Sequence, residues 1–216
     1  QGAYPENDLI NYIDQTFSLL HDNSIPDLIR VSVFHYLFGY LHPFYDGNGR
    51  TSRFITSFFL SKMLNKLVAF RLSITIKKSL RTYYKLFANT NDIRNRGDLT
   101  PFITGFLWLI EQSILRTVEL LREKMIELTN LKEILAHHHD FEDKLDKQIA
   151  FVLLQAALFS DAGASVTEIS RTIDKSAVTV KRHLKKLEPY TLINKEQRAH
   201  LYKLDLNKLK GIKSTQ

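Results

Sequence analysis

The chain has 216 residues, of which 44% are hydrophobic and 25% charged, and it carries a formal net charge of +7 with no cysteine. This composition indicates an ordinary globular protein and excludes disulfides, thiolate metal sites and a membrane span, for which no apolar run approaches the roughly 18 residues required. The opening residues QGAYPENDLI lack the features of a signal peptide, so we expect a cytoplasmic protein, and they lack an initiator methionine, so we expect an upstream segment.

Helix is predicted throughout the first two-thirds of the chain, because apolar residues recur there at helical spacing. The predicted helices cover residues 8–22, 26–41, 51–67, 74–91 and 100–131 or beyond. The helix that begins near Thr51 is apolar around most of its circumference, which predicts that it is buried on all sides. Thr100 is the expected N-cap of the last and longest helix, with Pro101 at its first position.

A break in the apolar pattern at residues 136–146 is the predicted linker between domains at 1–135 and 147–216. The three consecutive histidines 137–139 lie in this break. Adjacent helical residues point in different directions, and no second ligand cluster follows at a suitable spacing. A solvated linker is therefore favoured over a metal site.

The C-terminal segment is predicted to contain three helices followed by two short strands. The third helix begins at Ser176, a good N-cap residue, and the segment 192–205 alternates like a hairpin. This order resembles a winged helix-turn-helix domain. Residues 141–216 also carry 14 Lys and Arg against 9 Asp and Glu, which indicates a polyanionic partner. The candidate DNA contacts on the third helix are Thr179, Lys181, Arg182 and Lys185.

The nonapeptide HPFYDGNGR, residues 42–50, has more polar side chains than a turn requires. Gly47 and Gly49 allow backbone N–H groups to converge on one point, and the helix that follows adds its own free N–H groups. Arg50 and Arg53 suit the binding of phosphate oxygens, and Asp46 suits Mg²⁺. A histidine at the other end of the loop can accept a proton near neutral pH. Together these groups predict phosphoryl or nucleotidyl transfer.

The stretch HPFYDGNGRTSR resembles the signature of the Fic family, H-P-F-x-[D/E]-G-N-G-R-x-x-R, at every specified position. The resemblance extends over roughly residues 4–135. It implies a mainly α fold, with an all-helical Fic core, a short β-hairpin flap before the motif, and here a small α+β winged helix-turn-helix domain after the core. It also implies transfer of AMP from ATP to a Ser, Thr or Tyr hydroxyl of a target protein.

The resemblance assigns a role to each matching position. His42 is the expected catalytic base, and Asp46 the expected Mg²⁺ ligand. The α-phosphate is expected to be held by Gly47, Asn48 and Gly49, and the β- and γ-phosphates by Arg50 and Arg53. Phe44 is expected to be buried and to anchor the loop. Tyr83 and Tyr84 are candidates for flanking the adenine, although an amphipathic helix there favours a core position for at least one of them.

Three alternatives stay open at this point. Doc-like kinases of the same superfamily have Ala and Lys where this loop has Gly47 and Gly49, so AMP transfer is favoured over γ-phosphate transfer. Transfer of another phosphate-containing group is not excluded. A nucleotide-sensing, DNA-binding transcriptional regulator would not need the base at His42. The expected partners are the target protein, DNA through the winged helix, and a second copy of the chain in a homodimer, with no membrane.

A further expectation concerns inhibition. The family's inhibitory helix, of pattern [ST]-x-x-x-E-[GN], pairs its glutamate with the second arginine of the motif, here Arg53. Residues 2–7 read GAYPEN and do not match this pattern. The inhibitory helix is therefore expected upstream of the sequence, or control is expected to come from elsewhere.

Overall fold

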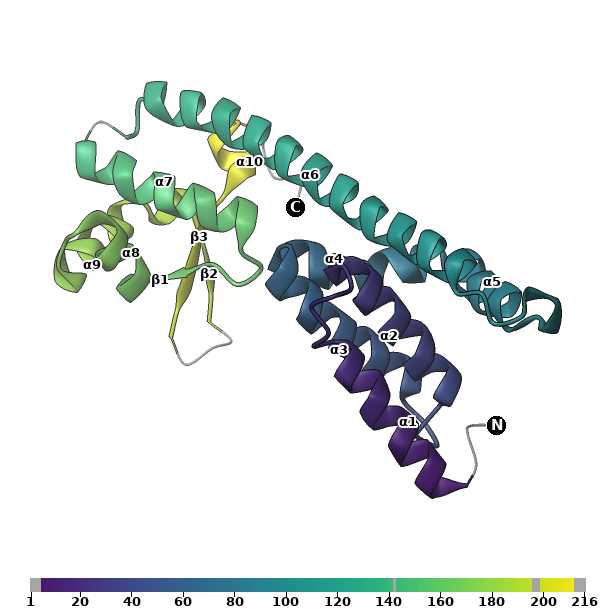
Figure 1. Cartoon of the computed structure of the whole chain (residues 1–216). Helices are drawn as coiled ribbons and strands as arrows, with labels where there is room; N and C mark the ends of the chain where they lie inside the picture. Colours follow the sequence, from purple (N-terminus) through teal and green to yellow (C-terminus); the bar gives the residue numbers. More distant parts are fainter. Residues whose placement is uncertain (1–4, 142, 196–198, 212–216) are drawn as a thin grey trace. The chain divides into compact units, whose positions relative to one another are not determined.

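A computed structural model describes residues 5–141, 143–195 and 199–211 of the chain (Figure 1). The chain forms two compact units, residues 1–120 and 121–216. Helices dominate the described residues, and a small three-stranded sheet lies in the second unit. The expectation of a mainly α fold is confirmed. No helix within the described ranges is long and apolar enough to cross a membrane.

The first unit is entirely helical in its described part. Its elements are α1 (Glu6–Leu19), α2 (Asp27–Leu41), α3 (Asn48–Met63), α4 (Lys66–Lys78), α5 (Leu80–Asn91), the 3₁₀ turn η1 (Ile93–Asn95) and the first part of α6 (Thr100–His137). Helix α3 packs against both α2 and α4. Four fully buried phenylalanines form the centre of the core, Phe34 and Phe38 from α2 and Phe102 and Phe106 from α6. The sequence holds at most the trailing edge of the expected flap, residues 2–5, of which residues 2–4 lie outside the described residues.

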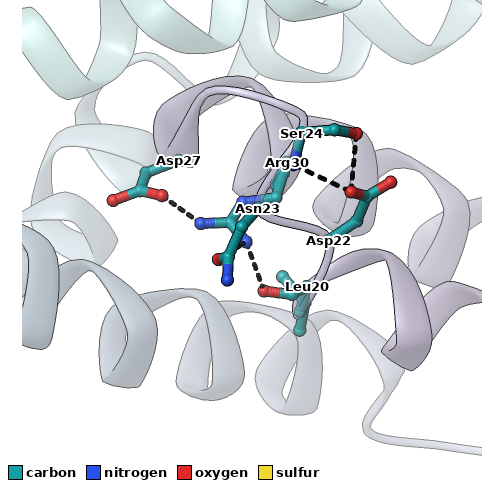
Figure 2. A network of polar contacts seen from close by, with 6 residues as sticks. All are labelled: Leu20, Asp22, Asn23, Ser24, Asp27 and Arg30. Atoms are coloured by element: carbon teal, nitrogen blue, oxygen red, sulfur yellow. Dashed lines mark hydrogen bonds and ion pairs between the residues drawn. The ribbon is translucent and has the colours of Figure 1, made fainter.

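The turn between α1 and α2 is fixed by a buried arginine (Figure 2). Arg30 is only 6% exposed, and its Nη1 donates to the Leu20 carbonyl and to Asn23 Oδ1, both at 3.2 Å. Its Nη2 pairs with the Asp27 carboxylate. Because Leu20 closes α1 and Arg30 lies in the first turns of α2, these contacts join the two helices directly. The start of α2 is thereby held in place, and α2 carries the nonapeptide loop at its other end.

Helix α3 differs from the expectation in where it begins and in which side it buries. It begins at Asn48, not near Thr51, so the GNG segment forms its first turn. The prediction of burial on all sides is wrong, since the side chains of Phe54 and Phe58 are 73% and 52% exposed. The buried side consists of residues spaced four apart, Asn48, Ser52, Thr56 and Leu60. Three of these four side chains are small or polar, which lets neighbouring helices approach this face closely.

The second unit combines helices with a sheet. Its elements are the end of α6, α7 (Lys144–Phe159), β1 (Ala164–Ser165), α8 (Val166–Ile173), α9 (Ala177–Lys186), the 3₁₀ turn η2 (Glu188–Tyr190), β2 (Thr191–Asn194), β3 (Leu201–Leu204) and α10 (Leu206–Leu209). The sheet is antiparallel with strand order β1-β3-β2. The three predicted helices and the hairpin are present, whereas β1 and α10 are too short to have been predicted.

Two helix starts in the second unit show how sequence fixes local structure. Ser165 caps α8 in a capping box, in which its hydroxyl accepts the Glu168 N–H and the Glu168 carboxylate accepts the Ser165 N–H. Ser176 caps α9 as predicted, with its hydroxyl accepting the Thr179 N–H at 3.2 Å. Both helices are short, so these caps contribute a substantial part of their stability.

Helix α6, the long teal helix of Figure 1, contributes side chains to the cores of both units. Phe102 and Phe106 belong to the core of the first unit, and Leu131 and Leu135 to that of the second. The division between the compact units falls between Leu120 and Leu121, inside this helix. The linker predicted at 136–146 lies further along the chain, because the apolar residues before it pack with α7.

Candidate active site

The loop between α2 and α3 begins at His42, which has a left-handed backbone conformation with φ of 51°. Its N–H donates to the Phe38 carbonyl at 3.3 Å and ends α2. The imidazole is exposed, and its Nδ1 lies 3.4 Å from the Gly39 carbonyl. A non-glycine residue in this conformation is uncommon and is typical of functional sites. The geometry leaves the ring available to a reacting group from solvent.

The loop is closed by the side chain of Asn48, at the first position of α3. Its Oδ1 accepts the Phe44 N–H at 2.9 Å, and its Nδ2 donates to the Phe44 carbonyl at 2.6 Å. The Asn48 side chain is 3% exposed. Each half of the amide thus makes a hydrogen bond inside the loop, while the backbone N–H of Asn48 remains for a ligand.

The prediction that Phe44 is buried as the apolar anchor of the loop is wrong. Its side chain is 51% exposed, and its ring lies 6.2 Å from that of Phe38. The physical reason is that Asn48 already holds the backbone of Phe44 through two hydrogen bonds. The anchor of the loop is polar, and the phenylalanine ring is left at the surface.

The start of α3 has the form of an anion site. Gly47 has φ of +86°, and its N–H donates to Asp46 Oδ1 at 2.6 Å. The first intrahelical bond runs from the Thr51 N–H to the Gly47 carbonyl. Because glycine has no side chain to act as a cap, the N–H groups of the first turn, on Asn48, Gly49 and Arg50, have no partner among the described residues. These N–H groups and the helix dipole attract negative charge.

Arg50 and Asp46 form a salt bridge across this helix start, with Nη2 3.0 Å from Oδ2. Both side chains are largely exposed, at 75% and 90% respectively. An exposed pair of this kind contributes little to stability, because water screens the attraction and both side chains lose freedom. Each partner can therefore be released at small cost, the guanidinium to a phosphate and the carboxylate to a cation.

Gly49 makes room for a neighbouring side chain. It lies within α3 and has no positive φ, so its conformation does not require glycine. A β-carbon at this position would lie 3.1 Å from Arg53 Nη1. The absence of a side chain thus makes room for the Arg53 guanidinium beside the first turn. Arg53 is half-buried, in contrast to the exposed Arg50.

The two tyrosines expected at the adenine occupy different environments. Tyr83 is 4% exposed, and its hydroxyl lies 2.8 Å from Nε2 of His35. Burial raises the pKa of the Tyr83 hydroxyl to about 12. Tyr84 is 60% exposed and its ring is open to solvent. Tyr83 therefore lies in the core of the first unit, and Tyr84 is the one of the two with an accessible ring.

Sequence reasoning missed His35, which lies two helical turns before His42 on α2. The side chain is fully buried, and its ring stacks on Phe106 with centroids 4.4 Å apart. Burial, reinforced by the charge of Arg53, lowers the pKa of His35 to about 3, so its ring is neutral. A single histidine within the apolar stretch VSVFHYLF was the only available signal, and it gave no indication of the partner on α5.

A second titratable cluster lies in the C-terminal unit. His183 Nδ1 on α9 lies 2.5 Å from Asp146 Oδ1 on α7 and 4.0 Å from Asp143 Oδ2. These three residues are the group that has metal-ligand spacing in the described part of the chain. Asp143 also caps α7, since its Oδ1 accepts the Leu145 N–H at 2.8 Å. The contacts present are a buried hydrogen bond between His183 and Asp146 and a capping aspartate, and the hydrogen bond joins α7 to α9.

The residues expected to contact DNA all lie on α9. Lys181, Arg182 and Lys185 are exposed, while the buried side of the helix is formed by Val180, His183 and Leu184. Thr179 is half-buried, and its hydroxyl lies 2.9 Å from that of Ser176. The three basic side chains therefore share the solvent side of one helix.

Comparison with known proteins gives matches of three kinds. The model of the Fic/DOC family matches residues 2–60. Proteins named protein adenylyltransferase Fic, from Drosophila virilis and Drosophila ananassae, are each 32% identical over 83 residues. The crystal structure of a Fic family protein from Desulfovibrio desulfuricans G20 is similar with a TM-score of 0.50 and 18% identity, covering 94% of this chain and 56% of that one.

The chain spans only a small part of the length of the curated relatives that it matches. The match to the two Drosophila proteins covers 38% of this chain and 15% of their own length. The structural likeness concerns the fold alone, because the sequence identity is low. The part that matches includes the whole loop from His42 to Arg53. Residues 2–60 thus match the Fic/DOC family, and the chain has the fold of a Fic family protein.

Proposed function

We propose that the protein is an adenylyltransferase that moves AMP from ATP to a Ser, Thr or Tyr hydroxyl of a target protein. The observation that carries this proposal is the arrangement of the α2–α3 loop. An exposed imidazole stands at one end, and a helix start with unpartnered N–H groups and two arginines stands at the other. This pairs a proton acceptor with an anion site, as transfer from a nucleotide requires.

In this proposal His42 is the catalytic base. Its ring is exposed and has only a long contact, 3.4 Å, to the Gly39 carbonyl. It can therefore take the proton of an incoming hydroxyl as the oxygen attacks the α-phosphorus. The pyrophosphate leaves as the new bond to AMP forms, so one P–O bond is made and one is broken.

The phosphates are assigned to the start of α3. The unpartnered backbone N–H groups of Asn48 and Gly49 receive the α-phosphate, with Gly47 shaping the turn before them, and Arg50 and Arg53 hold the β- and γ-phosphates. Asp46 is the Mg²⁺ ligand, since its exposed carboxylate offers the hard oxygen that Mg²⁺ prefers. When bound, Mg²⁺ would neutralise phosphate charge. A single protein ligand suits Mg²⁺, which usually keeps waters and substrate oxygens in its coordination shell.

The adenine contact is assigned to Tyr84, whose ring is exposed. Tyr83 is not assigned to stacking on the adenine, because its side chain is buried. The alternative in which the γ-phosphate or another phosphate-containing group is transferred uses the same loop. This alternative differs from AMP transfer in which part of the substrate lies at the anion site. The group found attached to the target protein therefore distinguishes the two reactions.

The proposal is tested with ATP labelled at the α- or the γ-phosphate, in the presence of Mg²⁺ and candidate target proteins. We expect the α-label to reach protein and the adduct to have the mass of AMP. The His42→Ala variant is expected to lose transfer by about 10² to 10⁴-fold while binding ATP as before. His21→Ala is a matched control, because His21 is also exposed, follows α1 and contacts a backbone carbonyl through Nδ1. Transfer of the γ-label, or full activity in His42→Ala, would contradict the assignment.

We further propose that the C-terminal unit is a winged helix that binds DNA through α9. The order α7, β1, α8, α9, β2, β3 supports this fold, and the exposed Lys181, Arg182 and Lys185 support an anionic partner. Contacts to phosphates weaken steeply as salt rises, because bound counterions are released. The rival function is that of a DNA-binding regulator. In it the first unit would only bind nucleotide as a signal and would transfer nothing.

Duplex DNA of mixed sequence, titrated at low and high salt, tests this second proposal. Reversal of charge in Lys181→Glu with Arg182→Glu is expected to abolish binding. The matched control is Lys77→Glu with Lys78→Glu, two adjacent exposed lysines on α4 of the other unit. An equal loss of DNA binding in this control variant would indicate that only the net charge of the chain attracts DNA. DNA binding that requires ATP, in a chain that transfers nothing, would favour the sensor function.

A further inference from the structure

A buried histidine joins three helices of the first unit. Thr56 Oγ1 on α3 lies 2.8 Å from Nδ1 of His35 on α2. The Tyr83 hydroxyl on α5 lies 2.8 Å from Nε2 of the same ring. The exposed fractions of Thr56, His35 and Tyr83 are 0%, 0% and 4%, and the imidazole stacks on Phe106 of α6. Both ring nitrogens of His35 therefore have a partner on another helix, in a region that water does not reach.

The ring of His35 is neutral and fully paired. Burial lowers the pKa of His35 to about 3, so one ring nitrogen donates a hydrogen bond and the other accepts one. A hydroxyl can do either, so Thr56 and Tyr83 satisfy the ring whichever nitrogen carries the proton. A shift of one helix against another would leave a buried polar group without its partner, which is costly. Two such bonds therefore fix the positions of helices more narrowly than apolar contacts alone.

The bond between His35 and Thr56 lies directly beneath the loop of the candidate active site. His35 precedes His42 by two helical turns, about 10 Å along α2. Thr56 lies about 12 Å along α3 from Asn48, on the same buried side of that helix. Asn48 in turn binds the backbone of Phe44 within the loop. The ends of α2 and α3 are thus fastened at the loop and again two turns below it.

We propose that His35 is a positioning residue that sets the relative placement of the base, the anion site and the adenine contact. The inference rests on the function proposed above, which assigns these roles to His42, the start of α3 and Tyr84. The bond to Thr56 holds α3 against α2 and so fixes the distance from His42 to the N–H groups of the first turn. The bond to Tyr83 holds α5 against α2 and so fixes the place of the neighbouring Tyr84. A misplacement of about 1 Å can lower the rate of a reaction by about 10²-fold.

The two bonds can be removed one at a time in the full chain. Thr56→Val keeps the shape of the side chain and removes the hydroxyl. We expect the kcat for transfer of the α-label to fall by about tenfold, with the Kd for ATP little changed, because the phosphates bind to α3 itself. Tyr83→Phe is expected to raise the Kd for ATP by about fivefold with a smaller change in kcat, because Tyr84 would lose part of its stacking on the adenine.

Substitutions of His35 itself provide a rescue of each bond. The amide of asparagine reaches about the position of Nδ1, and the amide of glutamine reaches about the position of Nε2. His35→Asn can therefore keep the partner on α3, and His35→Gln can keep the partner on α5. We expect His35→Asn to behave like Tyr83→Phe, and His35→Gln to behave like Thr56→Val. The reverse pairing would overturn the inference.

Thr75→Val is the matched control. Thr75 is as buried as Thr56, and its hydroxyl lies 3.1 Å from that of Ser113, which joins α4 to α6. Neither of these two helices carries a residue assigned to the active site. We expect Thr75→Val to lower stability in urea as much as Thr56→Val does, and to leave kcat and the Kd for ATP unchanged. An equal fall in kcat in both variants would overturn the inference, since general loss of core stability would explain it.

A second measurement needs no nucleotide, so it separates failure of this inference from failure of the proposed function. The chain has eight glycines, so labelling with isotopic glycine gives few backbone N–H signals in NMR spectra. The signals of Gly47 and Gly49 are identified by their loss in Gly47→Ala and Gly49→Ala. We expect Thr56→Val and His35→Gln to shift both signals, and His35→Asn and Thr75→Val to leave them in place.

Loop signals that ignore Thr56→Val would overturn the inference. If the unaltered chain binds no ATP while the glycine signals respond as expected, the proposed function is refuted and the placement of the loop by His35 is supported.

Discussion

Asn48 holds the backbone of Phe44 with both atoms of its amide, at 2.9 Å and 2.6 Å. The residue thus fixes the span of the loop between His42 and the start of α3. A side chain within the family signature therefore acts on the protein itself, and only its backbone faces the anion site.

Asn48→Ala is expected to destabilise the chain, because the part-buried N–H and carbonyl of Phe44 lose their partners. The free energy of unfolding should fall by about 2 kcal/mol, measured by urea denaturation. Transfer should be lost as well, since the loop is no longer closed. Asn11→Ala, at an exposed asparagine on α1, serves as control and should leave both properties unchanged. A stable Asn48→Ala chain would show that the amide bonds do not hold the loop.

The two glycines of the loop are expected to respond differently to alanine. Gly47→Ala places a side chain at φ of +86° and should cost about 1 kcal/mol of stability. Gly49→Ala lies in a helix, where alanine is favoured, so stability should be kept or raised. Its β-carbon would lie 3.1 Å from Arg53 Nη1, however, and should displace that side chain.

The measurements for these glycine variants are urea denaturation and calorimetric titration with ATP. We expect Gly49→Ala to weaken ATP binding without weakening the fold. Undiminished ATP affinity in Gly49→Ala would mean that Arg53 tolerates the added methyl group, or does not contact the nucleotide.

Asp46→Asn is expected to abolish the response of ATP binding to Mg²⁺ while leaving the fold unaffected. The amide keeps an acceptor for the Gly47 N–H but loses the negative charge that Mg²⁺ requires. Calorimetric titration with ATP, with and without Mg²⁺, measures this. Asp92→Asn is the control, because Asp92 is likewise paired with an arginine in a turn of the same unit. A normal Mg²⁺ response in Asp46→Asn would place the metal ligand elsewhere.

Acid should destabilise the first unit through His35. Its pKa is about 3 in the folded chain and 6.5 as the ordinary value, so between these limits the unfolded chain binds more protons. The stabilisation is therefore fully present above pH 6.5 and is lost as the pH falls toward 3. Between pH 7 and pH 5 this one group should lower the free energy of unfolding by about 2 kcal/mol.

The check is urea denaturation at both pH values. In His35→Gln this part of the pH dependence should disappear, even if the variant is less stable overall. His21→Gln, at an exposed histidine, should keep the full dependence. An equal pH dependence in all three chains would show that His35 is not held neutral.

Much of the fold could be predicted from sequence. Helical spacing located α2, α6 and α9, and Ser176 marked the start of α9. The predictions that failed depended on contacts between distant residues. Phe44 was expected inside because it is apolar, but its position depends on Asn48. The partners His35 and Tyr83 are 48 residues apart, and nothing in either local pattern indicates the other.

Cutting the chain at the break in its apolar pattern would remove part of a core. Leu131, Leu135 and Phe141 are each buried to at least 97%, and all three pack with Ile149 of α7. A fragment starting at residue 147 would lose these three side chains and leave an apolar cavity open to water. A fragment starting at residue 121 would retain them. To express the C-terminal unit alone, the first residue must therefore be chosen inside α6. The sequence pattern shows no domain boundary at that point.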